Sequence, residues 1–469
     1  MSAESTGTPR DVRRPNIVLI VSDDHGYADR SALGTPGVST PNLDRLAEEG
    51  ATFTDAYVTA PICSPSRAAM MTGQYQQRWG ATWFDTADIG TEPTIAEHLG
   101  KQGYATGYFG KVHYGPEGPG DRGCPPEHGF DESFYGLAGQ SMGRLHYLTH
   151  SEQAVDEYGE AAKPMGVQPM WEGREPVECD QFLTSAFADR ADDFITRHAE
   201  GPFFAMVAFN AVHNFCWQLP AEELEKRGLP AFEDWHPGAD EYIDWYDGAI
   251  SPHLANGRDY YLAQLELMDQ QVGELLERLD ALGIADDTIV VYLTDNGGSN
   301  CNYGNNAPLR GTKYTMWEGG IRVPMLMRWP GVTEPGSTSD ALVSSLDLAS
   351  TFTSAAGLTP PAELDGQDLA AVVQGASGHG ELHWDCGWQW ALRNDRWKLS
   401  WCDGKSQTAT EISRVEHTDT GDGLFLTDIR TDQGEAVNLA DQHPEIVDEL
   451  TRVHARWCVD VGLPDPRTR

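Results

Sequence analysis

Runs of apolar residues alternate with amphipathic stretches through most of the chain. Unbroken apolar runs, the pattern of strands buried on both faces of a sheet, occur at residues 17–21 and 203–209, and a further strand with an apolar core is expected at 288–294. Shorter strands are expected at residues 104–109 and 325–328. Helical patterns lie between the strands, at residues 40–49, 94–102, 181–198 and 259–282. Strands separated by helices predict an α/β fold with a large, doubly wound and mostly parallel sheet sandwiched by helices.

Two segments interrupt this alternation, at residues 141–179 and 214–258. Both are long, polar and rich in Trp, Tyr, Pro and acidic residues, and the second contains Trp217, Trp235 and Trp245. Long loops in compact enzymes commonly form lids or line binding sites. We therefore expect both segments to be loops without regular structure.

The pattern changes again near residues 375–380, which are small and rich in glycine. Beyond them, short strands are expected at residues 389–393, 397–401 and 424–429, and an amphipathic helix at 444–459. We therefore predict two domains. The main α/β domain would span residues 1–375, and a smaller C-terminal α+β subdomain with a short antiparallel sheet and a closing helix would span residues 376–469.

The charge balance narrows the range of partners. The 469 residues include 72 Asp and Glu against 33 Lys and Arg, a formal net charge of -39. Such an excess of acid argues against nucleic acid as a partner, and the chain has no basic tract for a membrane surface. No apolar stretch approaches the length of a membrane span. An acidic chain also repels anionic substrates, so local cations must bind any anion against the long-range field.

The first candidate for chemistry is the run from Cys63 to Gly73. Ser64 and Pro65 are typical of a helix start, and Gly73 is typical of a helix end. Cys63 would then lie at a helix N-terminus, where free N–H groups and the helix dipole favour an anion. Arg67 follows four residues later on the same face of the helix, where its guanidinium can stabilise a nearby oxygen.

Acidic pairs follow two of the predicted strands. Asp23 and Asp24 end the first strand, and Asp295 and Asn296 end a later one. Ligands of open α/β sheets bind at the carboxyl ends of the strands. Four oxygen donors without a histidine favour Ca²⁺ or Mg²⁺ over zinc. Taken alone, each pair is more often a helix cap or a solvated turn.

Three further runs place cationic or titratable side chains after strands or in turns. Lys111 and His113 lie in GKVH at 110–113, His213 ends NAVH at 210–213, and Lys313 lies in LRGTKYTMWEGGIRVP at 309–324. A histidine can exchange protons near neutral pH. Either histidine alone is more often a hydrogen-bonded structural residue.

Together these runs resemble the type I, formylglycine-dependent sulfatases of the alkaline phosphatase superfamily. Cys63, Pro65, Ser66 and Arg67 match the family's C-x-P-S-R maturation signature, and the G-K-x-H and L-R-G-x-K…E-G-G-x-R-x-P blocks follow in family order. The resemblance implies that a separate maturation enzyme oxidises Cys63 to formylglycine, whose hydrate carries two hydroxyls on one carbon. It also implies a cation, usually Ca²⁺. The ligands would be the modified Cys63 together with Asp23, Asp24, Asp295 and Asn296.

The resemblance further implies a role for each matched residue. One hydroxyl of the hydrate, activated near the cation and Arg67, attacks sulfur, while Lys111 and Lys313 neutralise the sulfate oxygens. His213, with Lys313, protonates the departing alcohol. His113 deprotonates the second hydroxyl, so that sulfate leaves and the aldehyde forms again. Residues 318–324 are expected to shape a turn rather than to contact substrate.

The expected function is therefore hydrolysis of a sulfate ester. A run rich in Trp at residues 383–390 could offer aromatic platforms to a lightly sulfated sugar or oligosaccharide, or these residues could only pack the small sheet. Three alternatives remain open: an aryl sulfatase, a phosphonate or phosphate monoester hydrolase of the same superfamily, and a non-catalytic, cation-dependent glycan-binding protein.

Cysteine usage and the N-terminal pattern predict a location. The apolar stretch at residues 16–22 is too short for a secretory signal and runs into Asp23 and Asp24. With Cys63 assigned to the chemistry, seven of the eight cysteines remain, and none form a C-x-x-C pair. This favours a reducing cytoplasm over a disulfide framework, although a chain trimmed of its leader would have the same features.

Overall fold

The computed structural model describes residues 14–115, 118, 120–137, 146–147, 169–233 and 242–468. Its strands are β1 (Asn16–Ser22), β2 (Ala51–Phe53), β3 (Ala56–Tyr57), β4 (Ala105–Val112), β5 (Glu132–Leu137), β6 (Met170–Glu172), β7 (Glu175–Val177), β8 (Phe203–Ala208), β9 (Thr288–Thr294), β10 (Met325–Arg328), β11 (Ser337–Ser339), β12 (Val343–Ser344), β13 (Glu381–Asp385), β14 (Gln389–Asn394), β15 (Trp397–Cys402) and β16 (Gly423–Asp428). Its α-helices are α1 (Pro41–Glu48), α2 (Cys63–Thr72), α3 (Ile95–Gly100), α5 (Leu183–His198), α6 (Ala221–Arg227), α7 (Tyr242–Ala249), α8 (Gly257–Ala281), α9 (Glu318–Ile321), α10 (Asp347–Ala355), α11 (Leu369–Val373), α12 (Gln407–Val415) and α13 (Pro444–Asp460).

The main sheet has ten strands in the order β11-β2-β10-β9-β1-β8-β4-β5-β6-β7. Its centre, from β9 through β1, β8 and β4 to β5, is parallel, whereas β10, β6 and β7 pair antiparallel to their neighbours. The predicted doubly wound and mostly parallel sheet is confirmed. The strand β5 and the short outer strands were not predicted. Three-residue strands such as β2, β6 and β7 carry little periodic signal.

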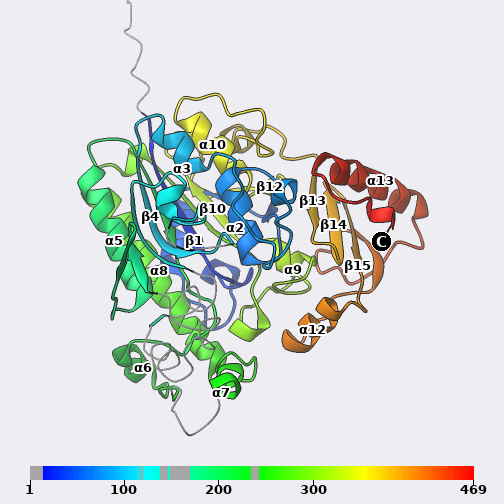
Figure 1. Ribbon diagram of the computed structural model, residues 1–469, viewed down its shortest axis with the longest axis horizontal. Helices are drawn as coiled ribbons and strands as arrows, with labels where there is room; N and C mark the ends of the chain where they lie inside the picture. The colour runs from blue at the N-terminus through cyan, green and yellow to red at the C-terminus, as the bar shows by residue number, and fades with distance from the viewer. Residues whose placement is uncertain are drawn as a thin grey trace, which may run out of the picture.

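Helices cover both faces of this sheet (Figure 1). In β1, Val18 and Ile20 face one core, with apolar residues of α1, α5 and α8. The alternate residues Ile17, Leu19 and Val21 face a second core, with apolar residues of α2, α3 and α10. Successive side chains of a strand point to opposite faces, so an unbroken apolar run is what a strand between two helix layers requires.

The register brings the carboxyl ends of four central strands to one edge. Ser22 of β1 pairs with Thr294 of β9, and Gly110 of β4 pairs with Ala208 of β8. Gly110 has φ +137, and a Cβ there would lie 1.8 Å from the Ala208 carbonyl oxygen. Only glycine allows β4 and β8 to approach this closely. The segments that follow these strands therefore share one end of the sheet.

The C-terminal residues form a separate sheet of four antiparallel strands, β13 to β16, against which α13 packs. It lies at the right of Figure 1. The predicted short antiparallel sheet and closing helix are confirmed, and the structure adds β13 and α12. The residues predicted to divide the chain, 375–380, lie between α11 and β13.

A buried charge network joins the small sheet to the main one. Lys398 of β15 lies 3.0 Å from Glu318 and 3.0 Å from Glu435, and Arg393 of β14 lies 2.6 Å from Asp55. Glu318 thus binds a neighbouring element, in agreement with the structural role expected for residues 318–324. We refer to Asp55, Glu318, Arg393, Lys398 and Glu435 as the seam network.

The prediction that residues 214–258 lack regular structure was wrong. They contain α6 and α7, and α8 begins at Gly257. In α6 acidic residues stand in the first turn and basic residues in the last, which suits the helix dipole. Trp217 is buried and stacks on Phe232 with ring centroids 4.6 Å apart. Its position therefore depends on tertiary contacts rather than on local sequence periodicity.

Part of the predicted loop regions lies outside the described residues. This holds for Trp235 and for most of residues 141–179, within which β6 and β7 are described. In the part of the chain that the structure describes, no helix is both long and apolar enough to cross a membrane. The cytoplasmic location stays a prediction.

Candidate active site

Cys63 is the first residue of α2, as the sequence predicts. Ile62 before it is extended, and Gly73 ends the helix in the left-handed conformation at φ 68. All ten residues of α2 are buried. The helix therefore presents its free N-terminal N–H groups inside the molecule, beside the carboxyl edge of the sheet, where they favour an anion.

Arg67 ties α2 to three strand ends. Its side chain is fully buried, and its Nε donates to Asp295 Oδ2 at 2.7 Å. Its Nη1 donates to the Lys111 carbonyl at 3.3 Å, and the guanidinium lies 3.8 Å from Asp23 Oδ2. A buried guanidinium needs carboxylate and carbonyl partners of this kind, so Arg67 holds the ends of β1, β4 and β9 in place around the first turn of α2.

The two predicted lysines lie against the two aspartates of β1. Lys111 Nζ is 2.5 Å from Asp23 Oδ2, and Lys313 Nζ is 2.9 Å from Asp24 Oδ2. Cys63 Sγ lies 3.6 Å from Asp23 Oδ1. Two ammonium groups, two carboxylates and the thiol thus meet in one buried cluster, although 289 residues separate Lys313 from Asp24.

The oxygen donors of this cluster fit a hard divalent cation. Asn296 Nδ2 donates to Asp24 Oδ1 at 2.6 Å, whereas Asn296 Oδ1 is buried without a hydrogen-bond partner among the described residues. A buried acceptor without a partner is costly, and a cation would satisfy it. Ligand atoms of Asp23, Asp24, Cys63 and His213 also lie within 4.8 Å of one another.

Neighbouring charges shift the acidity of the groups in the cluster. Burial, and then the charge of Asp295, raise the pKa of Asp23 to about 7. Although burial opposes its charge, the pKa of Asp295 is lowered, because Arg67 and the two lysines surround it. Burial and the charge of Asp295 also raise the pKa of the Cys63 thiol far above its usual range. An unmodified Cys63 is therefore a poor nucleophile at neutral pH.

The two predicted histidines lie at the same edge of the sheet. His213 Nε2 is 2.9 Å from Lys313 Nζ and 3.3 Å from Asp24 Oδ2, which brings it into the cluster. His113 follows the last residue of β4, two positions after Lys111, and is partly exposed. The structure thus joins His213 to the lysine that was predicted to act with it.

Sequence reasoning missed three polar residues that support the site. Asn302 Nδ2 donates to Asp24 Oδ2, and Asn306 bonds both the N–H and the carbonyl of Gly298. Glu416, directly after α12, accepts from Ser299 Oγ at 2.7 Å. The concentration of asparagines at residues 300–306, directly after the Asp-Asn-Gly-Gly turn, was a signal for the first two. Nothing in the sequence connects Glu416 with this loop.

The predicted aromatic platform is only partly at the surface. Trp384 and Trp390 are 1% and 2% exposed, with Trp384 Nε1 donating to the Val58 carbonyl and Trp390 stacking on His454. They pack the small sheet, the alternative left open for this run. Trp388, between β13 and β14, is partly exposed.

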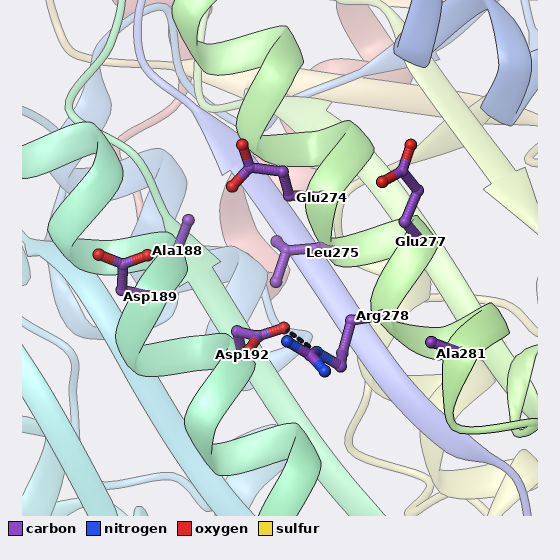
Figure 2. A pocket seen from close by; sticks show the side chains of 8 residues that line it. All are labelled: Ala188, Asp189, Asp192, Glu274, Leu275, Glu277, Arg278 and Ala281. Carbon is purple, nitrogen blue, oxygen red and sulfur yellow. Dashed lines mark hydrogen bonds and ion pairs between the residues drawn. The ribbon is translucent and has the colours of Figure 1, made fainter.

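A surface pocket lies away from these residues, between α5 and α8 (Figure 2). Its eight labelled lining residues all belong to these two helices and include Asp189, Asp192, Glu274 and Glu277. Arg278 pairs with Asp192 at 2.5 Å. A pocket dominated by carboxylates would repel an anionic substrate, so we assign the chemistry to the carboxyl edge of the sheet.

A parallel sheet that carries paired acidic residues, ammonium groups and a buried cysteine at one edge fits a hydrolase of anionic esters of the alkaline phosphatase superfamily. Within that class the chain belongs to the sulfatase family: the family model described as Sulfatase matches residues 15–358. Arylsulfatase A of Bos taurus is 30% identical over 467 residues, covering 93% of this chain and 85% of its own. N-acetylgalactosamine-6-sulfatase of Homo sapiens is 30% identical, covering 94% and 84%. The chain is thus a sulfuric ester hydrolase, of a family that works with a metal ion and formylglycine.

Solved structures agree with this assignment. Ps i-CgsB in complex with k-i-k-neocarrahexaose superposes with a TM-score of 0.75 at 27% identity, covering 95% of this chain and 93% of that one. The phosphonate monoester hydrolase of Agrobacterium radiobacter superposes with a TM-score of 0.61 at 21% identity, covering 96% and 95%. The second likeness shows a shared fold alone.

Proposed function

We propose that this sulfatase hydrolyses a sulfate ester of a sugar or short oligosaccharide, with formylglycine at position 63 and Ca²⁺ at the acidic edge. The observation that carries the proposal is the buried cluster in which Cys63, at the start of α2, meets two aspartates and two lysines. The sugar is supported by two relatives: one is N-acetylgalactosamine-6-sulfatase, and the other was solved with a neocarrahexaose.

The aldehyde hydrate would supply one hydroxyl to attack sulfur and a second from which the aldehyde forms again. A residue with a single hydroxyl would remain esterified, and the raised pKa of the Cys63 thiol argues against the unmodified side chain. The ion, held by Asp23, Asp24, Asp295 and Asn296, would supply positive charge for the substrate's oxygens.

The remaining steps belong to side chains of this chain. Lys111 and Lys313 bind the sulfate oxygens and stabilise the charge that develops on them. His213 donates a proton to the departing alcohol, with Lys313 at 2.9 Å to assist it. His113 accepts the proton of the second hydroxyl. Arg67 positions Asp295 and the N-terminus of α2.

The proposal is tested by measuring the modification and the activity on the same protein. Protein produced with and without a formylglycine-generating enzyme is digested, and the mass of the peptide that contains Cys63 gives the fraction of aldehyde. We expect sulfate release from sulfated mono- and disaccharides to rise in proportion to that fraction. We expect Cys63→Ala and Cys63→Ser to lose at least about a thousandfold in turnover. Full activity with a thiol throughout would contradict the proposal.

The cation is tested separately, on fully modified protein. Removal of divalent ions should abolish sulfate release, and Ca²⁺ should restore more of it than Mg²⁺ at equal concentration. An unchanged rate after removal would contradict the cation's role. Paired assays with an aryl sulfate and an aryl phosphonate measure how strongly this site prefers sulfur to phosphorus.

A further inference from the structure

Four aromatic side chains lie close to one another next to Lys313. Trp83 is central: its ring centroid lies 6.1 Å from that of Phe84, 6.2 Å from Tyr314 and 5.7 Å from Trp388. We call these four residues the aromatic cluster. They come from three segments far apart in the chain, so no sequence pattern groups them.

The aromatic cluster is connected directly to the site. Tyr314 follows Lys313, whose Nζ lies 5.3 Å from the Tyr314 ring centroid. The Tyr314 N–H donates to the Pro61 carbonyl at 2.6 Å, two residues before Cys63. On the other side, Gln389 Nε2 donates to the Tyr314 carbonyl at 2.6 Å. Tyr314 is thus held between the segment that enters α2 and the small sheet, so the rings keep a defined position relative to the sulfate-binding lysine.

Exposure differs among the four rings of the aromatic cluster, and Phe84 is the most exposed of them. Trp83 is 9% exposed, Tyr314 and Trp388 are partly exposed, and Phe84 is 59% exposed. An apolar ring at the surface gains free energy when a ligand covers it. The exposed Phe84 ring can therefore contact a part of a substrate that extends beyond its sulfate group.

The charge of the molecule favours an uncharged contact at this position. The chain has a formal net charge of -39. It would therefore repel a second sulfate group that lies beyond the reach of Arg67, Lys111 and Lys313. An aromatic face carries no net charge and packs against the C–H face of a sugar ring. It therefore binds a neutral ring without the penalty that the acidic surface imposes on an anionic one.

We propose that the aromatic cluster is a carbohydrate subsite that binds the unsulfated sugar ring next to the sulfated unit, with Phe84 as the exposed stacking face. This inference rests on the proposed function and extends it, because it names the neighbouring unit of the substrate and its chemistry. The preferred substrate is then an oligosaccharide with one sulfate at the cleaved position and a neutral neighbour.

The test uses fully modified protein and two substrates that carry the same sulfated sugar, one as a monosaccharide and one with a neutral ring attached. For Phe84→Ala we expect KM for the longer substrate to rise about three- to tenfold, with kcat within about twofold of wild type. KM for the monosaccharide should not change. Phe84→Trp, which keeps an aromatic face, should restore KM. Leu33→Ala, which removes another exposed apolar side chain outside the cluster, serves as the matched control.

Each failure has its own signature. An unchanged KM for the longer substrate, or an equal rise for both substrates, overturns the subsite and leaves the proposed function intact. A wild-type enzyme that cleaves aryl sulfates but neither sugar substrate overturns the sugar proposal itself. As a second measurement, an unsulfated disaccharide should quench the fluorescence of wild-type protein, through Trp83 and Trp388, at lower concentration than it does for Phe84→Ala.

Discussion

Charge balance at the level of single residues explains why the site can be buried. Three carboxylates and three permanent cations meet at the edge of the sheet: Asp23, Asp24, Asp295, Arg67, Lys111 and Lys313. The cations offset part of the cost of removing these carboxylates from water. A divalent ion and a sulfate ester then bring charges of opposite sign, so substrate binding adds little net charge to a buried region.

The position of His213 leads to a prediction about leaving groups. His213 Nε2 lies 2.9 Å from Lys313 Nζ, and a histidine that protonates the departing oxygen matters most for an alcohol that leaves poorly. For His213→Ala we expect kcat/KM to fall about a hundredfold or more for an alkyl or sugar sulfate. The loss should stay below about tenfold for an activated phenyl sulfate.

The measurement is a comparison of kcat/KM for both substrates on the same preparation. His443→Ala, a histidine half-exposed at the start of α13, controls for the loss of an imidazole. Equal losses on the two substrates would remove His213 from its role as an acid.

At the scale of elements, the ends of α2 determine whether its N-terminus reaches the sheet edge. Gly73 ends α2 at φ 68, and a Cβ there would lie 2.4 Å from the Ala349 Cβ of α10. Gly283, after α8, has φ 69 and no described atom within 4 Å of such a Cβ. The two glycines therefore share a conformation and differ in packing.

This pair allows conformational strain to be separated from steric overlap. For Gly283→Ala we expect a loss of about 1 kcal/mol in the free energy of unfolding, from the left-handed backbone alone. For Gly73→Ala we expect about 1 to 3 kcal/mol more, because α10 must move. Urea unfolding measures both losses. Equal losses of unfolding free energy in the two variants would mean that α10 moves at little cost. The contact between Gly73 and α10 would then not determine the position of α2.

At the scale of the whole molecule, the seam network lies between the ten-stranded sheet and the four-stranded sheet. Glu318 and Glu435 share Lys398, each at 3.0 Å. Burial, opposed by Lys398 and reinforced by Glu318, raises the pKa of Glu435 to about 7, from 4.5. An acid with a raised pKa binds its proton more tightly in the folded state. Its contribution to stability therefore falls as the pH rises from 4.5 to about 7.

Glu435→Gln should remove this pH dependence. Relative to wild type, the variant should gain about 1 to 3 kcal/mol in the free energy of unfolding between pH 5 and pH 8. Denaturant unfolding at the two pH values measures the difference, with Glu411→Gln, on the exposed side of α12, as a surface control. A difference that does not change with pH would show that Glu435 titrates alike in the folded and unfolded chain.

Local pattern was sufficient for β1, β4, β8 and β9 and for the residues that follow them. An unbroken apolar run such as 17–21 has to be buried on both faces, and the residue after it then has to lie at the carboxyl edge. Cys63 reached a helix N-terminus for an equally local reason, since Ser64, Pro65 and Gly73 define both ends of α2. These features depend on residues within one or two turns of chain.

Only the tertiary structure decided which distant residues meet. The contacts of Asn302 with Asp24, of Glu416 with Ser299 and of Trp83 with Tyr314 join segments separated by more than a hundred residues. It also decided that α6 and α7 form where local pattern indicated loops, and that Trp384 is buried while Trp388 is partly exposed. The sequence specifies the type and order of most elements through local periodicity. The contacts between distant residues depend on how the layers pack, and local periodicity carries no information about that packing.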